Sequence, residues 1–200
     1  MQLMDRRGDT IVEVLFAFTV FSLIAVGGLS LMSQGTALAQ RALEIGLVRE
    51  QIDSQADALR FLNRAYIADF GKNGEATKIW DKVVTANWVD TAQNFDTIAD
   101  GTKCNLPGPG DKPFTLDVTK LDSNPLLAPS AEVSTYARVR HDVTGASAEG
   151  LWIQAVGSKN PVSGAPDFYD FHIRACWQTP GQSAPVTLGT IVRLYVPSQS

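Results

Sequence analysis

The carboxylate of Glu13 is the group in this chain whose position most strongly suggests a chemical role. It is the only charged residue in the apolar run 11–32. About 20 apolar residues are enough to span the hydrocarbon core of a bilayer. A carboxylate inside such a span costs up to about 2.5–3.5 kcal/mol at mid-membrane. A plain anchor has no need of a residue with that cost, so the pattern predicts that Glu13 has a function beyond anchoring.

The histidines do not lie in a pattern typical of catalysis. His141 and His172 both lie near arginines in segments of alternating character. A general base is one interpretation. A surface residue of a strand is the interpretation we favour, because no Ser/His/Asp, Cys/His or His-Glu-x-x-His arrangement is present. The run 107–110 lacks the Lys-Ser/Thr of a phosphate loop. We therefore expect no enzymatic activity and no cofactor.

Metal binding is not expected either. Asp96, Asp100 and Asp111 could contribute to a calcium site, but their spacing matches no calcium-binding loop, and a solvated loop is the favoured interpretation. Cys104 and Cys176 are the only cysteines, and they form no spacing typical of a zinc site. They allow either one disulfide that closes a long loop or two buried free thiols.

The composition suits one globular domain attached to a membrane segment. Of the 200 residues, 44% are hydrophobic and 19% are charged, and the net charge is −4. A mildly acidic chain without a run of basic residues lacks the electrostatic footprint of a nucleic-acid-binding protein. Arg6 and Arg7 precede the apolar run, which places the N-terminus in the cytoplasm and the remainder outside.

Two interpretations compete for the N-terminal segment. A secretory signal has a basic start, an apolar core of about 7–15 residues and a cleavage site after it. The apolar run here is longer, and the small residues at 33–37 leave such a cleavage as the lesser alternative. In the other interpretation the cut precedes the apolar run. The segment MQLMDRRG, followed by DTIVEVLF, resembles the N-terminus of type IV prepilins and pseudopilins: Gly8 would end a short basic leader, and Glu13 would be the fifth residue of the mature chain.

The resemblance implies a role for each residue of this segment. A prepilin peptidase would recognise a leader that carries Arg6 and Arg7 and would cut between Gly8 and Asp9. N-methylation would then fall on Asp9, where the family usually has Phe or Met. Glu13 would pair with the N-terminal amine of a neighbouring subunit and set the register between subunits in a filament.

The same resemblance bears on two further pairs of residues. Gly27 and Gly28 lie where major pilins often carry a proline, in a region where the helix loosens on assembly. A glycine pair would permit the same loosening, because each glycine weakens a helix interior by about 1 kcal/mol relative to alanine. Members of the pilin family often have a disulfide in their C-terminal region, and the resemblance therefore favours a Cys104–Cys176 disulfide over free thiols.

Beyond the apolar run the hydrophobic residues follow a helical period. The pattern predicts one long helix over residues 10–70, ended by Gly71 and by the pair 73–74. The second half of this helix is expected to pack on the chain's own sheet, with a coiled-coil dimer as the alternative. Its apolar stripe recurs every seven residues, with alanines between: Leu38, Ala42, Ile45, Ile52, Ala56, Leu59 and Tyr66.

The rest of the chain indicates a sheet-containing head. Residues 71–130 are the least regular part, and 131–200 contain four segments typical of strands, at 136–141, 151–156, 168–177 and 188–196, with turn-rich segments such as 144–150 between them. The tryptophans are expected in the core or on a sheet face, with an exposed adhesive platform as the alternative: Trp80, Trp88, Trp152 and Trp177.

The expected fold is α+β and type IV pilin-like, with an antiparallel sheet of about four strands packed on the outer half of the helix. Its parts would be a leader at 1–8, an assembly half-helix at 9–35, an amphipathic half-helix at 36–70 and a globular head at 71–200.

The expected function is that of a structural subunit, major or minor, of a type IV pilus-like surface filament. The partners would be the prepilin peptidase, other pilin subunits and the membrane, crossed once by residues 11–32 before assembly. No nucleic acid is expected as a partner, and roles in adhesion or twitching motility stay open. The alternatives are a pseudopilin of a secretion or DNA-uptake apparatus, and a monomeric membrane-anchored extracellular binding domain.

Overall fold

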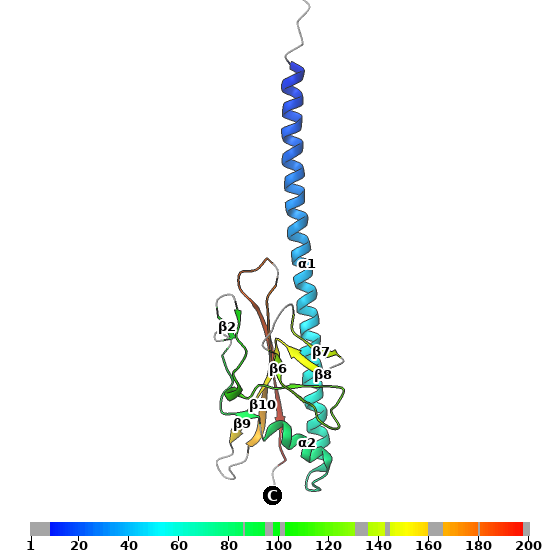
Figure 1. The fold of residues 1–200 in the computed structure, drawn as a ribbon, viewed down its shortest axis with the longest axis vertical. Helices are drawn as coiled ribbons and strands as arrows, with labels where there is room; N and C mark the ends of the chain where they lie inside the picture. The colour runs from blue at the N-terminus through cyan, green and yellow to red at the C-terminus, as the bar shows by residue number, and fades with distance from the viewer. Residues whose placement is uncertain are drawn as a thin grey trace, which may run out of the picture. The chain divides into compact units, whose positions relative to one another are not determined.

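The computed structural model has an α+β arrangement, with a long N-terminal helix followed by several small sheets (Figure 1). It describes residues 9–85, 87–94, 98–100, 103–130, 136–142, 145–159, 166–179 and 181–197. The chain divides into two compact units, Met1–Leu43, named here the anchor unit, and Glu44–Ser200, named here the head. The predicted leader, with Arg6, Arg7 and Gly8, lies outside the described residues.

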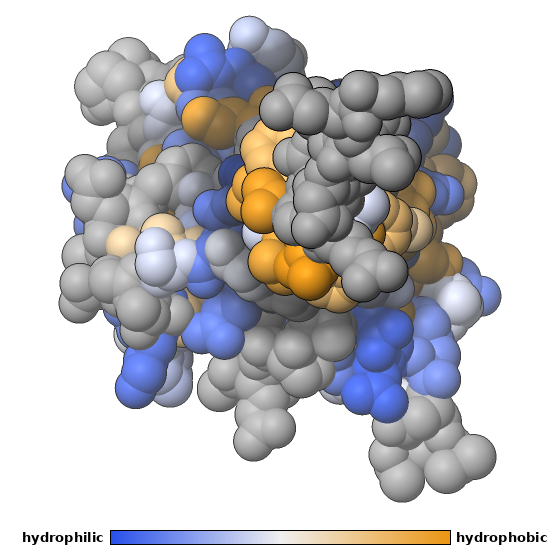
Figure 2. All heavy atoms as spheres, turned by 90° about the horizontal axis from the view of Figure 1, so that it is seen from above, coloured by the Kyte–Doolittle hydropathy of each residue, from blue (hydrophilic) through white to orange (hydrophobic). Residues whose placement is uncertain are grey.

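Helix α1 extends from Asp9 to Asp69, close to the range that the periodicity predicts. Over residues 11–32 of the anchor unit its surface is apolar all round apart from Glu13, and the large side chains from Ile11 to Met32 are exposed. In the view from above, apolar side chains gather around the end of this helix (Figure 2). Among the described residues, α1 is the one helix long and apolar enough to cross a membrane, with a mean hydropathy of 2.3 in its apolar stretch.

In the head, α1 has a different character and buries a single apolar stripe. The predicted stripe positions Leu38 and Ala42 are exposed, because they precede Glu44, where the head begins. After Asp69 the chain turns through Gly71 and Asn73, whose φ angles of +79° and +51° are left-handed and end the helix. The buried residues of the stripe are Val48, Ile52, Ala56, Ala58, Leu59, Leu62 and Tyr66.

The largest sheet has four strands in the order β1-β9-β10-β11. Its long strands are β9 (Leu151–Lys159), β10 (Pro166–Trp177) and β11 (Val186–Tyr195), which pair antiparallel as neighbours. The fourth strand, β1 (Trp88–Val89), pairs parallel with β9, so the sheet is mixed. Side chains of one face of β10 enter the same core as α1, as their alternation predicts: Tyr169, Phe171, Ile173, Ala175 and Trp177.

A second sheet corrects two sequence-based expectations. The segment at 136–141 was expected in the main sheet, but β7 (Arg138–Asp142) pairs instead with β8 (Gly145–Glu149). The segment 144–150 was expected as a turn, yet it holds β8, which also pairs parallel with β6 (Pro129–Ser130). Small residues such as those of β8 have weak strand propensity, and pairing with neighbouring strands overrides it.

The remaining elements are short, and in the sequence they lie between α1 and β6. Helix α2 (Glu75–Val84) adds Ile79, Trp80 and Val83 to the core of the head. The others are β2 (Ala99–Asp100), β3 (Lys103–Cys104), η1 (Pro109–Asp111), β4 (Thr115–Leu116) and β5 (Leu126–Leu127).

Candidate assembly site

Glu13 lies on the second turn of α1 with its side chain exposed. Within the described part of the chain, nothing donates a hydrogen bond to its carboxylate or forms an ion pair with it. One turn further along the helix lie Phe16 and Ala17, both exposed. A carboxylate on an apolar surface is expensive unless it is paired. Any partner that the described residues do not supply must come from elsewhere, and a second molecule is one source.

The other residues predicted around Glu13 are only partly described. Asp9 is the first residue of α1, about one helical turn before Glu13. Gly8 and the two arginines of the leader lie outside the described residues, so cleavage stays a prediction. Gly27 and Gly28 continue α1 without interruption, and beyond the adjacent helix backbone and the two chain neighbours no atom lies within 4 Å of where a Cβ would stand on either. Loosening of the helix at this pair also stays a prediction.

The two cysteines meet in the head. A disulfide joins Cys104 of β3 to Cys176 of β10, with the Cα atoms 5.7 Å apart. Cys176 is buried in a small second cluster with Ile98 and Trp152, on the face of β10 opposite the main core. The bond therefore holds the irregular segment around β3 against the main sheet.

The tryptophans are mostly core residues. Trp80, Trp152 and Trp177 have at most 1% of their surface exposed, so these three form no adhesive platform. The side chain of Trp88 lies outside the described residues.

The aspartates considered for a calcium site and the two histidines are only partly described. Asp96 lies outside the described residues, and no group of three or more potential metal ligands occurs in the part of the chain that the structure describes. His172 is half-buried on β10, where burial and the charge of Arg174 lower its pKa. His141 lies on β7, with its Nδ1 4.0 Å from Oδ1 of Asp117. No arrangement of these groups resembles a catalytic site.

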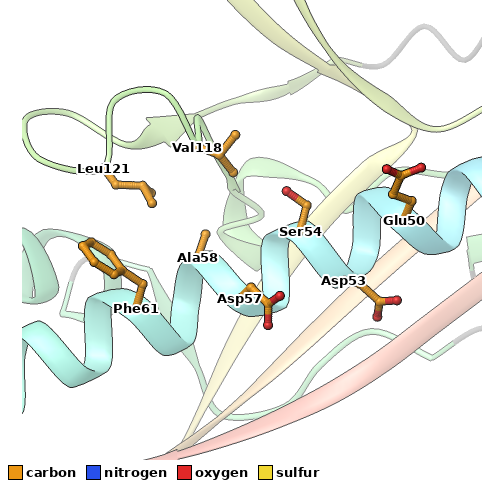
Figure 3. Close-up of a pocket in the computed structure, with 8 residues that line it drawn as sticks. All are labelled: Glu50, Asp53, Ser54, Asp57, Ala58, Phe61, Val118 and Leu121. Carbon is orange, nitrogen blue, oxygen red and sulfur yellow. The ribbon is translucent and has the colours of Figure 1, made fainter.

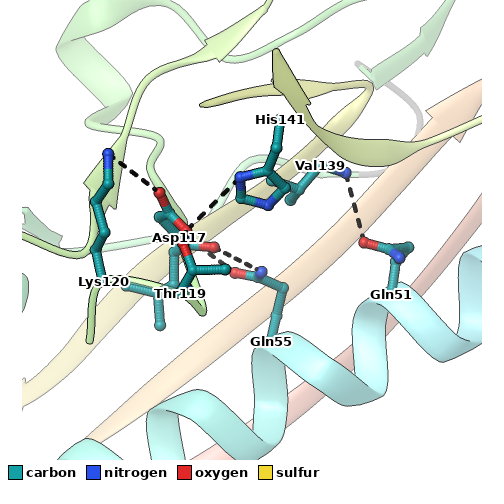
Figure 4. A network of polar contacts seen from close by, with 8 residues as sticks. Gln51, Gln55, Asp117, Thr119, Lys120, Val139 and His141 are labelled. Atoms are coloured by element: carbon teal, nitrogen blue, oxygen red, sulfur yellow. Dashed lines mark hydrogen bonds and ion pairs between the residues drawn. The ribbon is translucent and has the colours of Figure 1, made fainter. Parts of the chain in front are cut away.

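Asp117 belongs to a polar network that sequence reasoning did not find (Figure 4). Its side chain is buried, and its Oδ1 accepts hydrogen bonds from the backbone and the hydroxyl of Thr119, at 3.0 and 2.6 Å. Burial alone would raise the pKa of Asp117. The bonds from Thr119 and the nearby His141 and Lys120 outweigh burial and hold the pKa below its usual value. The network is structural, because it orders the turn that follows β4.

Next to this network, Gln55 joins α1 to β4. Its amide nitrogen donates to the carbonyl oxygen of Leu116 at 2.9 Å, and its amide oxygen accepts from the N–H of Leu116 at 2.8 Å. Both groups are buried, and a buried backbone group requires such a partner. The apolar stripe gave no sign of this contact, because a glutamine in a helix looks like a surface residue.

A second polar contact joins α1 to the main sheet at the start of the head. Glu44 is buried, and one of its carboxylate oxygens accepts hydrogen bonds from Nε1 of Trp177 at 3.2 Å and from the hydroxyl of Thr179 at 2.9 Å. These bonds fix α1 to the end of β10. A charged residue at this position in a sequence usually indicates a solvated face, which is why its role became visible only in the structure.

A groove of about 500 Å³ runs along the head portion of α1 (Figure 3). Ala58 and Phe61 of the helix lie on one side, and Val118 and Leu121 of the loop after β4 lie on the other. Phe61 is 54% exposed and Val118 is 40% exposed. Three carboxylates of α1 also line the groove: Glu50, Asp53 and Asp57. The sequence signal that could have revealed it is Phe61, an aromatic residue outside the apolar stripe.

Comparisons with protein-family models, with curated proteins and with solved structures found no match.

Proposed function

We propose that the protein is a structural subunit of a type IV pilin-like filament, major or minor, that polymerises through the anchor unit of α1. One observation carries the proposal. Glu13, without a partner among the described residues, sits on a half-helix that is apolar all round, and the same helix continues into a folded head. A filament subunit needs a surface that is stable first in lipid and then against copies of itself.

The physical chemistry of the anchor unit supports both states. Helices are suited to lipid because all backbone hydrogen bonds are satisfied within the segment. The exposed side chains are large and apolar, with Phe18 68% and Leu23 74% exposed. Such a helix can leave the bilayer for a bundle of identical helices without losing a backbone hydrogen bond, and it gains side-chain packing there.

Glu13 would set the register of that bundle. Cleavage before Asp9 would create an ammonium group about one turn from Glu13. In an apolar surrounding, the ammonium of one subunit and the carboxylate of the next attract strongly, and each offsets the cost of burying the other. The carboxylate of Asp9 would stand beside the same ammonium and compete for it. Apolar packing alone tolerates many axial offsets, whereas this pairing favours one.

The proposal extends to processing and location. A prepilin peptidase would remove residues 1–8, and the subunit would wait in the cytoplasmic membrane with its head outside. A pseudopilin would use the same chemistry in a shorter assembly. A monomeric anchored binding domain would keep its leader and would have no use for Glu13.

The test is the assembly of full-length variants in cells. Glu13→Ala should lower the number of sheared surface filaments sharply while leaving the amount of membrane-held subunit unchanged. Glu13→Gln keeps the shape without the charge and should act like alanine. Ser22→Ala is the matched control, since Ser22 is partly exposed on the same half-helix and bonds only to the Phe18 carbonyl oxygen among the described residues. It should assemble normally.

Two results would count against the proposal. Mass spectrometry of the native protein should find Asp9 at the N-terminus, so an intact Met1 or a start near Ala37 would contradict the processing. Wild-type subunit that stays monomeric in the membrane would favour the anchored binding domain.

A further inference from the structure

The groove between α1 and the loop after β4 brings together apolar side chains from two distant segments (Figure 3). Phe61 comes from α1, and Val118 and Leu121 come from the loop, about sixty positions later. The helix directs only small side chains at the middle of the groove, Ser54 and Ala58, which leaves space above the helix. Phe61 and Val118 are exposed. A hollow with exposed apolar side chains is typical of a docking surface.

The edge of the groove on α1 carries carboxylates at helical spacing. Glu50, Asp53 and Asp57 lie at positions i, i+3 and i+7, so they share one side of the helix over about 10 Å. All three are exposed, and within the described part of the chain Glu50 and Asp53 form no ion pair or hydrogen bond. Asp57 forms an exposed ion pair with Arg60, which contributes little in water and is readily exchanged for another. The groove therefore offers negative charge beside apolar surface.

Both walls of the groove are fixed within the head. Gln55 joins α1 to Leu116 through two hydrogen bonds, at 2.9 and 2.8 Å, and Leu116 lies two positions before Val118. Asp117 accepts two hydrogen bonds from Thr119, which order the same loop. A surface that is ordered before binding loses less conformational entropy when a ligand binds. The groove is therefore preformed.

We infer that the groove binds a basic segment of a partner protein, with an apolar side chain of that segment between Phe61 and Val118. The carboxylates require arginine or lysine, and the apolar walls require the apolar side chain, so a bare cation would use only part of the surface. A second copy of this chain is a poor occupant, because its net charge of −4 would repel the groove. The inference goes beyond the proposed function and does not depend on it, since every lining residue belongs to the head.

Short labelled peptides test the inference on the full-length protein in nonionic detergent. The first probe is an octapeptide of three arginines, two leucines and three serines, and fluorescence anisotropy, corrected for empty micelles, measures its binding. We expect saturable binding that weakens as salt is raised. A probe with glutamates in place of the arginines should bind at least about tenfold more weakly, because like charges then face each other. A probe with serines in place of the leucines should also lose at least about tenfold.

Variants of the groove locate the binding. Glu50→Gln combined with Asp53→Asn should weaken the first probe by about tenfold or more, because the charge pairing is lost. Phe61→Ala should have an effect of similar size through the loss of apolar contact. Ser54→Phe leaves the charge unchanged and fills the middle of the groove, so it should also block the probe.

The controls match these changes outside the groove. Glu75→Gln combined with Asp81→Asn removes the same charge from exposed positions of α2, and Ile191→Ala removes an exposed apolar side chain from β11. Both should bind the first probe like the wild type, and the melting temperatures of all variants should stay close to the wild-type value.

The outcomes separate the inference from simple charge attraction. Loss of binding in the groove variants but not in the controls supports it. A leucine-free probe that binds as tightly as the first would overturn it, because the carboxylates would then attract any cation. Equal binding of the glutamate probe, equal losses in groove and control variants, or no saturable binding of the first probe to the wild type would also overturn it.

Discussion

Glu13 and Glu44 lie on the same helix and differ in everything that surrounds them. Glu13 is exposed among apolar side chains and has no partner among the described residues, whereas Glu44 is buried and accepts two side-chain hydrogen bonds. The first carboxylate is available to another molecule, and the second holds the head together. One residue type on one helix is thus exposed or bonded within the head according to what the rest of the chain places beside it.

The same contrast extends to the apolar residues of α1. In the anchor unit they cover the whole circumference and contact no core, while in the head they form one buried stripe. Substitutions in the anchor unit should therefore affect insertion and assembly, and substitutions in the head should affect the free energy of unfolding. The following variants test that division in detergent-solubilised full-length protein, from the largest expected effect to the smallest.

The disulfide should give the largest effect on the head. Replacing both Cys104 and Cys176 by serine should lower the free energy of unfolding by about 4 kcal/mol, because the unfolded chain regains the freedom of a long loop. The two cysteines are 72 positions apart. Urea unfolding followed by tryptophan fluorescence measures the loss. Membrane insertion should not change, and an unaltered urea midpoint would show that the head does not depend on this bond.

A matched pair of leucines should separate the two units directly. Leu59→Ala should cost about 2–5 kcal/mol, because Leu59 is fully buried in the core and its removal leaves a cavity. Leu23→Ala should leave the unfolding of the head unchanged, since Leu23 is exposed on the anchor unit. Thermal unfolding followed by near-UV circular dichroism compares the two. Equal losses would mean that the units do not unfold independently.

The two glutamates should separate the two units in the same way as the two leucines, with a smaller loss in the free energy of unfolding of the head. Glu44→Ala should lower the free energy of unfolding by about 1–3 kcal/mol, because it removes the acceptor of the buried indole N–H of Trp177. Glu13→Ala should have no effect on unfolding. A urea titration of each variant measures the free energy of unfolding. Equal destabilisation of the head by Glu13→Ala and Glu44→Ala would contradict the division between the two units.

The smallest effect is confined to alkaline pH. Burial raises the pKa of Tyr169 to about 12, with a further contribution from Tyr66 and Asp81. Its neutral form is favoured in the folded head, so this contribution is complete below pH 10 and is lost as pH rises toward 12. The free energy of unfolding of the Tyr169→Phe variant should therefore fall less steeply with pH in this window than that of the wild type. Urea midpoints measured across this pH window compare the variant with the wild type.

The local pattern of the sequence predicted the elements whose periodicity is strong. The helix expected at 10–70 is α1, Asp9–Asp69, and the segments expected at 151–156, 168–177 and 188–196 lie within or largely overlap β9, β10 and β11. Hydrophobic period depends on neighbouring residues alone, so it can be read without knowledge of the fold. Glu13 was visible for the same reason, as one charge in an uninterrupted apolar run.

Only the tertiary structure decided which strands pair and which polar residues join α1 to the head. The pairing of β8 with β7, and the parallel addition of β1 to β9, depend on segments brought together from a distance and on no local signal. The bonds of Gln55 to Leu116 likewise join α1 to a segment about sixty positions away. The groove beside Phe61 is lined by α1 and by the same distant segment. A polar residue in a helical pattern has the same appearance whether it faces water or a buried backbone group. The difference lies in what the rest of the chain places opposite it.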